Sequence, residues 1–246
     1  MRPGAELTVI LHQTRSPDNL GAVCRIMANF DFHRLILSEP ITRDFSGAER
    51  LAVKSGHVLE GLVVADTLTE AVKDCVYVVG STSRTQVEGR SPLTPEEAAR
   101  RLAEESKRGR VALLFGGEQR GLSDEDLTHC ADVLVIPTSE VQPSMNLAQS
   151  ASVLLYLCHR QGVEPSGPPA AEPGARLGTL SALSTRMKET LLAADFLNRQ
   201  APEHVLHELE QTLMRSKLTQ REAELWLNAF KHLGRAMAPG AKPGAT

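Results

Sequence analysis

The sequence predicts an α/β protein with a mostly parallel sheet, followed by a small all-α extension. Short apolar runs alternate with segments of helical spacing as far as about residue 162. Strands that alternate with helices form parallel sheets with helices on both faces. Residues 163–176 repeat Pro, Gly and Ala, which is typical of a linker, and only helical patterns follow. We therefore expect a first domain at 1–162, a linker at 163–176, a helical extension at 177–237 and a disordered tail at 238–246.

The first domain should alternate strand and helix from its beginning to its end. Apolar runs rich in β-branched residues predict strands at residues 7–11, 34–37, 62–64, 76–79, 111–115 and 133–136. Apolar residues at three- and four-residue steps, together with capping signals, predict helices at 20–30, 47–55, 67–73, 94–109, 123–130 and 147–160. The expected N-caps are Asn19, Thr67, Thr94 and Ser123, and Thr94 is followed by Pro at N1 and Glu at N3.

The extension should contain helices only. Helical spacing covers residues 177–198 and 204–215, and a capping box of Thr219 and Glu222 opens a helix to about residue 233. The extension is too small to bury a large core of its own.

Composition excludes several classes of protein. The chain has 246 residues, of which 41% are hydrophobic and 23% charged, and no apolar run approaches the roughly 20 residues of a membrane-spanning helix. No secretory signal pattern opens the chain, so we expect a cytoplasmic protein without membrane contact. The four cysteines are far apart in apolar surroundings, which predicts reduced, buried thiols and no zinc site. Because the net charge is −3, any nucleic acid must bind a local basic surface.

Three polar loops follow predicted strands and carry the candidate chemistry. The first contains Asn19, Gly21 and Arg25, the second reads FGGEQRGL from residue 115, and the third runs from Ile136 to Asn146 into a long apolar helix. Ligands of open α/β sheets bind beyond the carboxyl ends of the strands, where helix N-termini present unpaired N–H groups. Each loop alone could be an ordinary helix cap. The GGEQRG pattern is neither the dinucleotide fingerprint nor the phosphate-binding loop that ends in Gly-Lys-Ser/Thr.

Together the three loops resemble a known family. NLGAVCR, LLFGGEQRGLS and VIPTSEVQPSMNLAQSASVLLY are similar, in the same order, to the signature motifs of the SpoU/TrmH family of SPOUT RNA 2′-O-ribose methyltransferases. The resemblance covers about residues 7–160. The segment HELEQTLMRSKLTQREAE and its surroundings resemble the C-terminal extension of the TrmJ-type enzymes, which methylate the ribose of nucleotide 32 in the tRNA anticodon loop.

The resemblance implies a SPOUT fold with a deep trefoil knot near the C-terminus of the catalytic domain, a homodimer, and S-adenosyl-L-methionine bound in the knot. The catalytic residues that it implies are Arg25, Asn19, Glu118, Ser144 and Asn146. The cofactor-binding residues that it implies are Ser81, Thr82, Ser83, Gly116, Gly117, Ile136, Pro143, Ser144 and Met145. Many relatives have Leu in place of Met145, a change that keeps the volume of the side chain.

The resemblance leaves some alternatives open. The expected reaction is 2′-O-ribose methylation of tRNA, and the alternatives are methylation of ribosomal RNA and an inactive, knotted RNA-binding paralogue. Because all five polar residues of the catalytic set are present, the inactive paralogue is disfavoured. The sequence does not decide which nucleotide is modified, nor whether Arg25 is a base or stabilises charge. No metal is implied.

Overall fold

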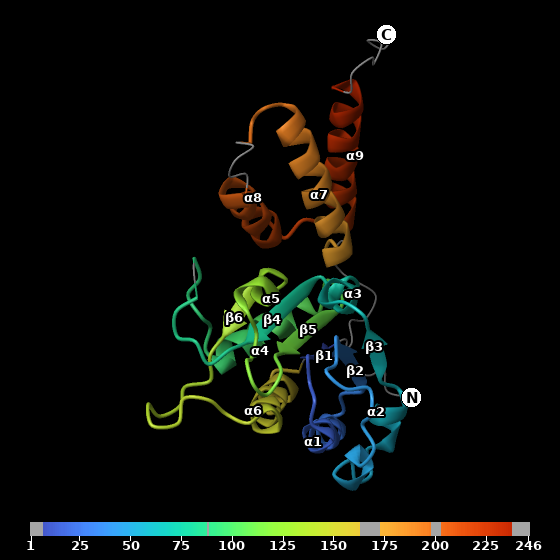
Figure 1. The fold of residues 1–246 in the computed structure, drawn as a ribbon, viewed down its shortest axis with the longest axis vertical. Coiled ribbons are helices and arrows are strands. Elements are labelled where there is room, and N and C mark those ends of the chain that lie inside the picture. Colours follow the sequence, from blue (N-terminus) through green and yellow to red (C-terminus); the bar gives the residue numbers. More distant parts are fainter. Residues whose placement is uncertain (1–6, 88, 163–172, 198–202, 238–246) are drawn as a thin grey trace. The chain divides into compact units, whose positions relative to one another are not determined.

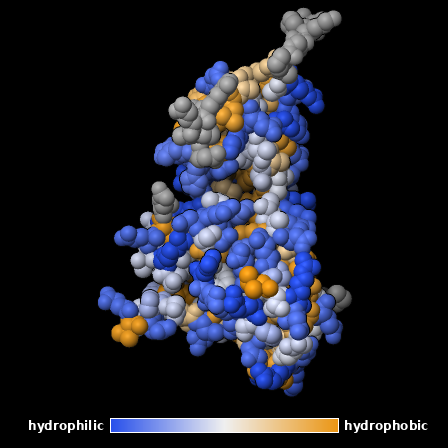
Figure 2. All heavy atoms as spheres, viewed as in Figure 1, coloured by the Kyte–Doolittle hydropathy of each residue, from blue (hydrophilic) through white to orange (hydrophobic). Residues whose placement is uncertain are grey.

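The computed structural model describes residues 7–87, 89–162, 173–197 and 203–237, which form two compact units, Met1–Ala171 and Glu172–Thr246 (Figure 1). Most of the expected linker and the whole of the expected tail lie outside the described residues. On the face drawn in Figure 2, the surface is largely hydrophilic with scattered hydrophobic residues, as is normal for folded proteins. In the described part of the chain, no helix combines the length and the apolar character needed to cross a membrane.

The first unit is built on a six-stranded, fully parallel sheet of order β3-β2-β1-β5-β4-β6. Its strands are β1 (Leu7–His12), β2 (Arg34–Ser38), β3 (Val63–Ala65), β4 (Tyr77–Ser81), β5 (Val111–Phe115) and β6 (Asp132–Leu134). Every residue of β1 and β5 is buried, as expected for central strands covered on both faces. The strand order reverses between β1 and β5, and such a switch point is where open α/β sheets bind ligands.

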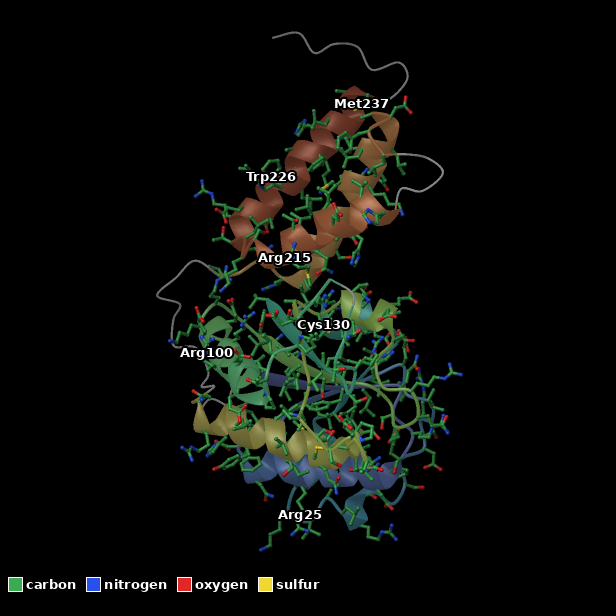
Figure 3. All side chains as sticks on the ribbon, turned by 90° about the vertical axis from the view of Figure 1, so that its left-hand side faces the viewer. Arg25, Arg100, Cys130, Arg215, Trp226 and Met237 are labelled. Carbon is green, nitrogen blue, oxygen red and sulfur yellow. The ribbon has the colours of Figure 1, made fainter. Side chains whose placement is uncertain are left out.

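Helices cover the sheet, so the predicted fold class is confirmed. They are α1 (Pro17–Asn29), α2 (Gly56–Glu60), α3 (Leu68–Val72), α4 (Pro95–Glu105), α5 (Asp124–Thr128) and α6 (Leu147–Arg160). In Figures 1 and 3, α1 and α6 lie side by side on one face of the sheet. Their apolar faces, which include Val23, Met27, Ala151 and Leu155, are fully buried in the main core.

Two local predictions were wrong. The helix expected at 47–55 is a single 3₁₀ turn, η1 (Ala48–Arg50), and the left-handed backbone of Lys54, with φ of 60°, is incompatible with a helix through the end of that segment. The η1 turn presses on α1: a Cβ at Gly21 would lie 2.1 Å from the carbonyl oxygen of Ala48. In addition, the N-cap of α1 is Ser16 and not Asn19, since the Ser16 hydroxyl accepts the Asn19 N–H at 3.2 Å. The side chain of Asn19 is therefore not used as a cap.

The second unit consists of α7 (Leu177–Ala193), α8 (Glu203–Arg215) and α9 (Gln220–Ala236). The predicted capping box of Thr219 and Glu222 is confirmed at the start of α9. Leu183 and Ala223 are fully buried in this unit, in which α7 packs along α9. The Ala175 N–H donates to the Leu218 carbonyl at 2.8 Å, which joins the chain before α7 to the chain before α9.

Candidate active site

A cavity of about 500 Å³ opens at the carboxyl ends of β4, β5 and β6, within the range of small-molecule sites. The loop after each of these strands contributes to its wall, and the first turn of α1 adds Asn19. The predicted residues that line it are Asn19, Ser81, Thr82, Ser83, Gly116, Gly117, Glu118, Ile136, Pro143, Ser144, Met145 and Asn146. The structure therefore brings together, in one cavity, every predicted site residue except Arg25.

Glu118 occupies the centre of the polar part of this site. Its Oε1 accepts hydrogen bonds from Asn19 Nδ2 at 2.9 Å, from the Ser16 N–H at 3.2 Å and from Thr14 Oγ1 at 3.2 Å. Its Oε2 accepts the Arg15 N–H at 3.2 Å. One carboxylate thus binds the loop between β1 and α1 to the loop that follows β5.

Asn146 connects the third loop to the same network. Its side-chain oxygen accepts the N–H groups of Ala148 at 2.8 Å and Gln149 at 3.3 Å, so it is the N-cap of α6. Its Nδ2 donates to Asn19 Oδ1 at 3.0 Å. The amide of Asn19 therefore accepts from Asn146 and donates to Glu118. All three loops singled out in the sequence are joined through side chains, and the ordinary capping role of Asn146 holds at the same time.

Hydrogen bonding keeps Glu118 ionised. Partial burial by itself would raise the pKa of this carboxyl group. The hydrogen bonds from Asn19 and from the backbone of Ser16 and Arg15 outweigh burial, and they hold the pKa of Glu118 below its usual value. At neutral pH the site therefore contains a fixed negative charge whose lone pairs are directed at the β1–α1 loop.

The need for glycine at position 117 has a structural cause that the sequence alone did not reveal. The resemblance implied only that Gly117 binds the cofactor. In the structure, a Cβ at position 117 would lie 2.4 Å from the carbonyl oxygen of Gln13, so the absence of a side chain lets the β5 loop pass against the β1 loop. This close approach places Glu118 within reach of Asn19.

Further residues of the site were not predicted. The cavity is also lined by Arg84, Gln119, Arg120, Thr138, Gln142 and Ser150. Arg84 donates to the Leu122 carbonyl at 3.0 Å and to Asp124 at 2.6 Å, so it braces the β4 loop against the start of α5. These residues stand within or beside the predicted loops, but only their positions in space identify them as lining residues.

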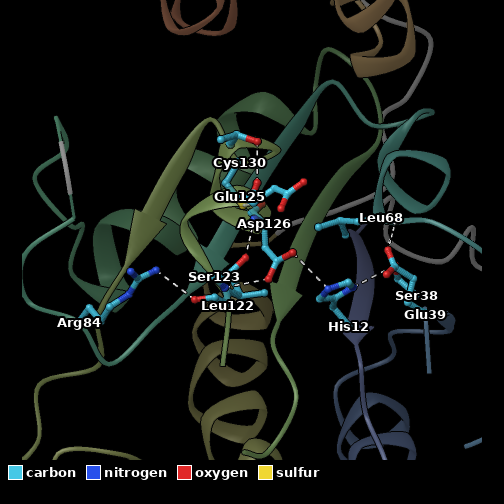
Figure 4. A network of polar contacts seen from close by, with 11 residues as sticks. His12, Ser38, Glu39, Leu68, Arg84, Leu122, Ser123, Glu125, Asp126 and Cys130 are labelled. Atoms are coloured by element: carbon cyan, nitrogen blue, oxygen red, sulfur yellow. Dashed lines mark hydrogen bonds and ion pairs between the residues drawn. The ribbon is translucent and has the colours of Figure 1, made fainter. Parts of the chain in front are cut away.

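A buried polar network supports the same edge of the sheet (Figure 4). His12, at the end of β1, has Nδ1 3.2 Å from the Ser38 hydroxyl at the end of β2. Its Nε2 lies 3.2 Å from Asp126 Oδ1, an ion-pair contact without hydrogen-bond geometry. The other Asp126 oxygen accepts the Ser123 N–H at 2.8 Å in the capping box of α5. The network ties the ends of two strands to the helix that follows the β5 loop.

Arg25 lies outside the cavity. It follows Asn19 by six residues, which on an α-helix turns the side-chain direction by about 240° and advances it by about 9 Å. Arg25 is exposed, and Figure 3 shows it on the side of α1 away from the sheet. Within one chain, Arg25 is therefore not among the residues that line the cavity.

No cysteine lines the cavity in the part of the chain that the structure describes. All four cysteines are free and buried, as predicted, and burial raises the pKa of Cys24, Cys130 and Cys158 to about 12. Such thiols are inert at neutral pH. Among the residues that the structure describes, no group of three or more His, Cys, Asp or Glu side chains is arranged to hold a metal ion.

Comparison with known proteins identifies the family. Residues 6–156 match the model of the SpoU rRNA Methylase family. The chain belongs to this family. The SpoU methylases use S-adenosylmethionine as methyl donor. The match ends within α6, so it includes all three loops of the cavity and excludes the second unit.

Several SpoU relatives align with both units. A protein of Pseudomonas aeruginosa named tRNA (cytidine/uridine/adenosine-2′-O-)-methyltransferase TrmJ is 29% identical over 231 residues, which are 89% of this chain and 90% of the relative. The crystal structure of TrmJ from Z. mobilis ZM4 is 25% identical with a TM-score of 0.79, and covers 92% of this chain and 98% of that one. A structure described as showing 2-OH methylation of C/U34 on tRNA is 27% identical with a TM-score of 0.51, but it covers only 63% of this chain and 95% of that one.

Glu118→Ala should loosen the β1–α1 loop without unfolding the protein. The N–H groups of Arg15 and Ser16 lose their acceptor, so their protection from hydrogen exchange should fall several-fold. Exchange of the segment 12–20 can be followed by mass spectrometry or NMR. Glu140→Ala is the matched control, because Glu140 is exposed in a cavity loop and has no partner among the described residues. Equal protection in the two variants would contradict the role of Glu118.

The same protection should depend on pH in one direction. Because the folded-state pKa of Glu118 is lowered, its stabilising effect is fully present above the ordinary glutamate pKa of about 4.3. It should be lost as the pH falls through the lower folded value. Protection factors for the Arg15 and Ser16 amides should therefore be constant from neutral pH down to about 5 and decrease only in more acid solution. A decrease between pH 7 and 5 would show that another group controls the loop.

Proposed function

We propose that the chain transfers a methyl group from S-adenosyl-L-methionine to the 2′-hydroxyl of a ribose in tRNA, at C or U of position 32. The observation that carries this proposal is the hydrogen-bonded set of Asn19, Glu118 and Asn146, which joins all three SpoU loops at one cavity. The presence of all five polar residues of the expected catalytic set supports an active enzyme over an inactive paralogue. We also propose that the reaction takes place in the cytoplasm.

The cavity residues fit the cofactor in their chemistry. The hydroxyl groups of Ser83 and Ser144 line the cavity and have no hydrogen-bond partner among the described residues, so they are available to a ribose or a purine. Ile136 and Met145 add apolar contacts for an adenine ring. We infer that these residues, with Ser81, Thr82, Gly116, Gly117 and Pro143, hold the cofactor, which supplies an electrophilic methyl group on a sulfonium. We also propose that this part of the chain forms the trefoil knot.

The protein must make a poor nucleophile reactive. The ribose 2′-oxygen forms a bond to the methyl carbon while the carbon–sulfur bond breaks, and the hydroxyl proton must leave. Negative charge develops on that oxygen, so a donor directed at it lowers the barrier. We propose that Arg25 is this donor, because a guanidinium with a pKa above about 12 stays charged in proteins. It would hydrogen-bond the developing alkoxide and the neighbouring phosphate, and the proton would pass to phosphate or water.

Because Arg25 does not line the cavity of its own chain, we propose that it serves the cavity of a second copy. Tyr156, on α6, is 45% exposed, and its ring centroid lies 5.9 Å from that of Phe30, the C-cap residue of α1. We therefore propose an isologous homodimer that packs these helices together and brings each Arg25 to the partner's cavity. Two equal sites then form, each from both chains.

The second unit favours tRNA and nucleotide 32 over the alternatives. The cofactor and the ribose are common to all RNA 2′-O-methyltransferases, so the cavity alone does not distinguish ribosomal RNA, position 32 or position 34. The structure concerned with C/U34 aligns with 63% of this chain, whereas TrmJ proteins align with about nine tenths of it. The helical extension is thus a feature shared with the TrmJ proteins, and we assign to it the choice of substrate.

Mapping ribose methylation tests the proposed function directly. Total RNA from cells with and without the gene should differ at C or U of position 32 in tRNA, and purified protein with S-adenosylmethionine should restore the missing modification. Ribosomal RNA from the same cells is the internal comparison. A difference at position 34 or in ribosomal RNA alone would replace the assigned substrate, and no difference in any RNA would support the inactive paralogue.

Arg25→Ala should lower methyl transfer by at least about 10²–10³-fold, the loss expected for one preorganised donor to a developing oxyanion. Cofactor affinity, measured by calorimetry, should be unchanged. Mixing Arg25→Ala with Glu118→Ala should restore activity to about a quarter of the wild-type value, since half of the mixed dimers are heterodimers with one intact site. A mixture of Arg25→Ala with the double variant of both positions is the control and should stay inactive.

Three outcomes would contradict this account of Arg25. Near wild-type turnover of Arg25→Ala would remove its catalytic role, and failure of the mixture to recover would place the residue in its own chain's site. A monomer by light scattering with full activity would exclude the dimer. Arg25→Lys separates two mechanisms: substantial activity would indicate that charge suffices, and none would indicate that the planar, two-pronged guanidinium is needed.

Ending the chain after Gly162 should preserve cofactor binding but weaken tRNA binding and turnover. The second unit adds cations such as the exposed Arg215, and RNA loops are read over a broad surface of phosphates, riboses and unstacked bases. Trp226, the single tryptophan, is 52% exposed on α9, so its fluorescence in the full chain should change when tRNA binds this unit. Unchanged turnover after truncation would assign the unit to stability or dimerisation.

A further inference from the structure

Two arginines lie close to Glu118: the backbone N–H of Arg15 donates to its carboxylate, and Arg120 follows it by two residues in the same loop. Arg15 lies in the loop after β1, and Arg120 lies in the loop after β5, where it lines the cavity. Both are exposed. They come from neighbouring strands at the switch point of the sheet, so they are placed where RNA must approach to present a ribose to the cavity.

The backbone at both arginines is fixed by hydrogen bonds. The Arg15 N–H donates to Glu118 Oε2 at 3.2 Å, and the next N–H, of Ser16, donates to Oε1. Arg120 lies in a turn closed by the Gly121 N–H, which donates to the Gly117 carbonyl at 2.9 Å. The starting points of both side chains are therefore held relative to Glu118, while the guanidinium groups extend into solvent.

These two guanidinium groups are not neutralised by the protein. Other arginines near this edge are paired with carboxylates: Arg84 lies 2.6 Å from Asp124, and Arg50 lies 2.8 Å from Asp18. Arg15 and Arg120 have no hydrogen bond from their side chains and no ion pair among the described residues. In a chain of net charge −3, they are local positive charges beside a fixed carboxylate that would otherwise repel RNA.

We infer that Arg15 and Arg120 bind backbone phosphates of the RNA strand that carries the target ribose. This inference rests on the proposed function. Phosphates lie on both sides of every ribose, so two cations on the loops that carry Glu118 and contact it can hold the strand while a ribose is presented to the cavity. Guanidinium groups suit this task, because their planar fork matches phosphate oxygens. The contacts read no base, so they contribute to affinity and register for any sequence.

The salt dependence of tRNA binding tests the inference. Each phosphate contact that is lost should reduce the slope of log K against log [salt] by about 0.7–0.9. The full-length Arg15→Ala and Arg120→Ala proteins should each show this reduction and bind tRNA on the order of 10-fold more weakly at physiological salt. In the double variant, the slope should fall by about twice the reduction expected for each single variant. KM for tRNA should rise more than kcat falls, because binding and not chemistry is affected.

Arg34→Ala is the matched control. Arg34 is also exposed and without a partner among the described residues, but it stands at the first residue of β2, at the opposite end of the strands. Its removal changes net charge by the same amount, so an effect of overall charge would appear equally in all variants. Arg15→Lys and Arg120→Lys should restore the salt slope, since they keep a cation at each position.

The outcomes separate this inference from the function on which it rests. Wild-type protein that neither binds nor methylates tRNA would overturn both. Normal methylation by the wild type, with slopes of Arg15→Ala and Arg120→Ala equal to that of Arg34→Ala, would overturn the phosphate contacts alone. Loss of affinity for S-adenosylmethionine in Arg120→Ala, with an unchanged tRNA slope, would assign Arg120 to the cofactor's carboxylate and overturn its RNA contact.

Discussion

The carboxylate of Glu118 is the interaction on which the site depends. It accepts hydrogen bonds from two side chains and two backbone N–H groups, which belong to the segment between β1 and α1 and to the first turn of α1. This segment would otherwise leave backbone donors without protein partners at the edge of the sheet. Glu118 belongs to the loop after β5. Its hydrogen bonds therefore join the loops that follow β1 and β5, in addition to the backbone pairing of these two parallel strands.

The requirements of the fold and of the site are met by the same residues. Asn146 caps α6 with its side-chain oxygen and uses its amide nitrogen to fix Asn19. Gly117 allows two loops to pass in contact, and that contact brings Glu118 to the first turn of α1. A cap and a functional group are therefore not competing interpretations of such residues. A change at either position would alter stability and site geometry together, so stability must be measured beside activity.

Two carboxylates at this edge of the sheet have structural roles. The carboxylates of Asp126 and Glu118 contact protein groups, one at the His12 network and one at the β1–α1 loop. Both networks are built from parts that are distant in the sequence, and they hold the ends of the strands in place before any ligand arrives. Preorganisation of this kind spares the cost of ordering loops when a substrate binds.

The sequence by itself determined the fold class, most of the elements and nearly all of the cavity. Periodicity and capping residues are local properties, so the strands, the helix that begins after Asn146 and the box at Thr219 were found without tertiary information. Tertiary structure decided the rest. Ser16 caps α1, so the side chain of Asn19 can bond to Glu118. The segment expected as a helix at 47–55 contains only a 3₁₀ turn, and Gly117 allows a close contact between two loops. Arg25 belongs to the same sequence motif as Asn19 but lies on another side of α1. Spacing along the chain indicates which residues share a helix, whereas packing of distant segments decides which of them meet.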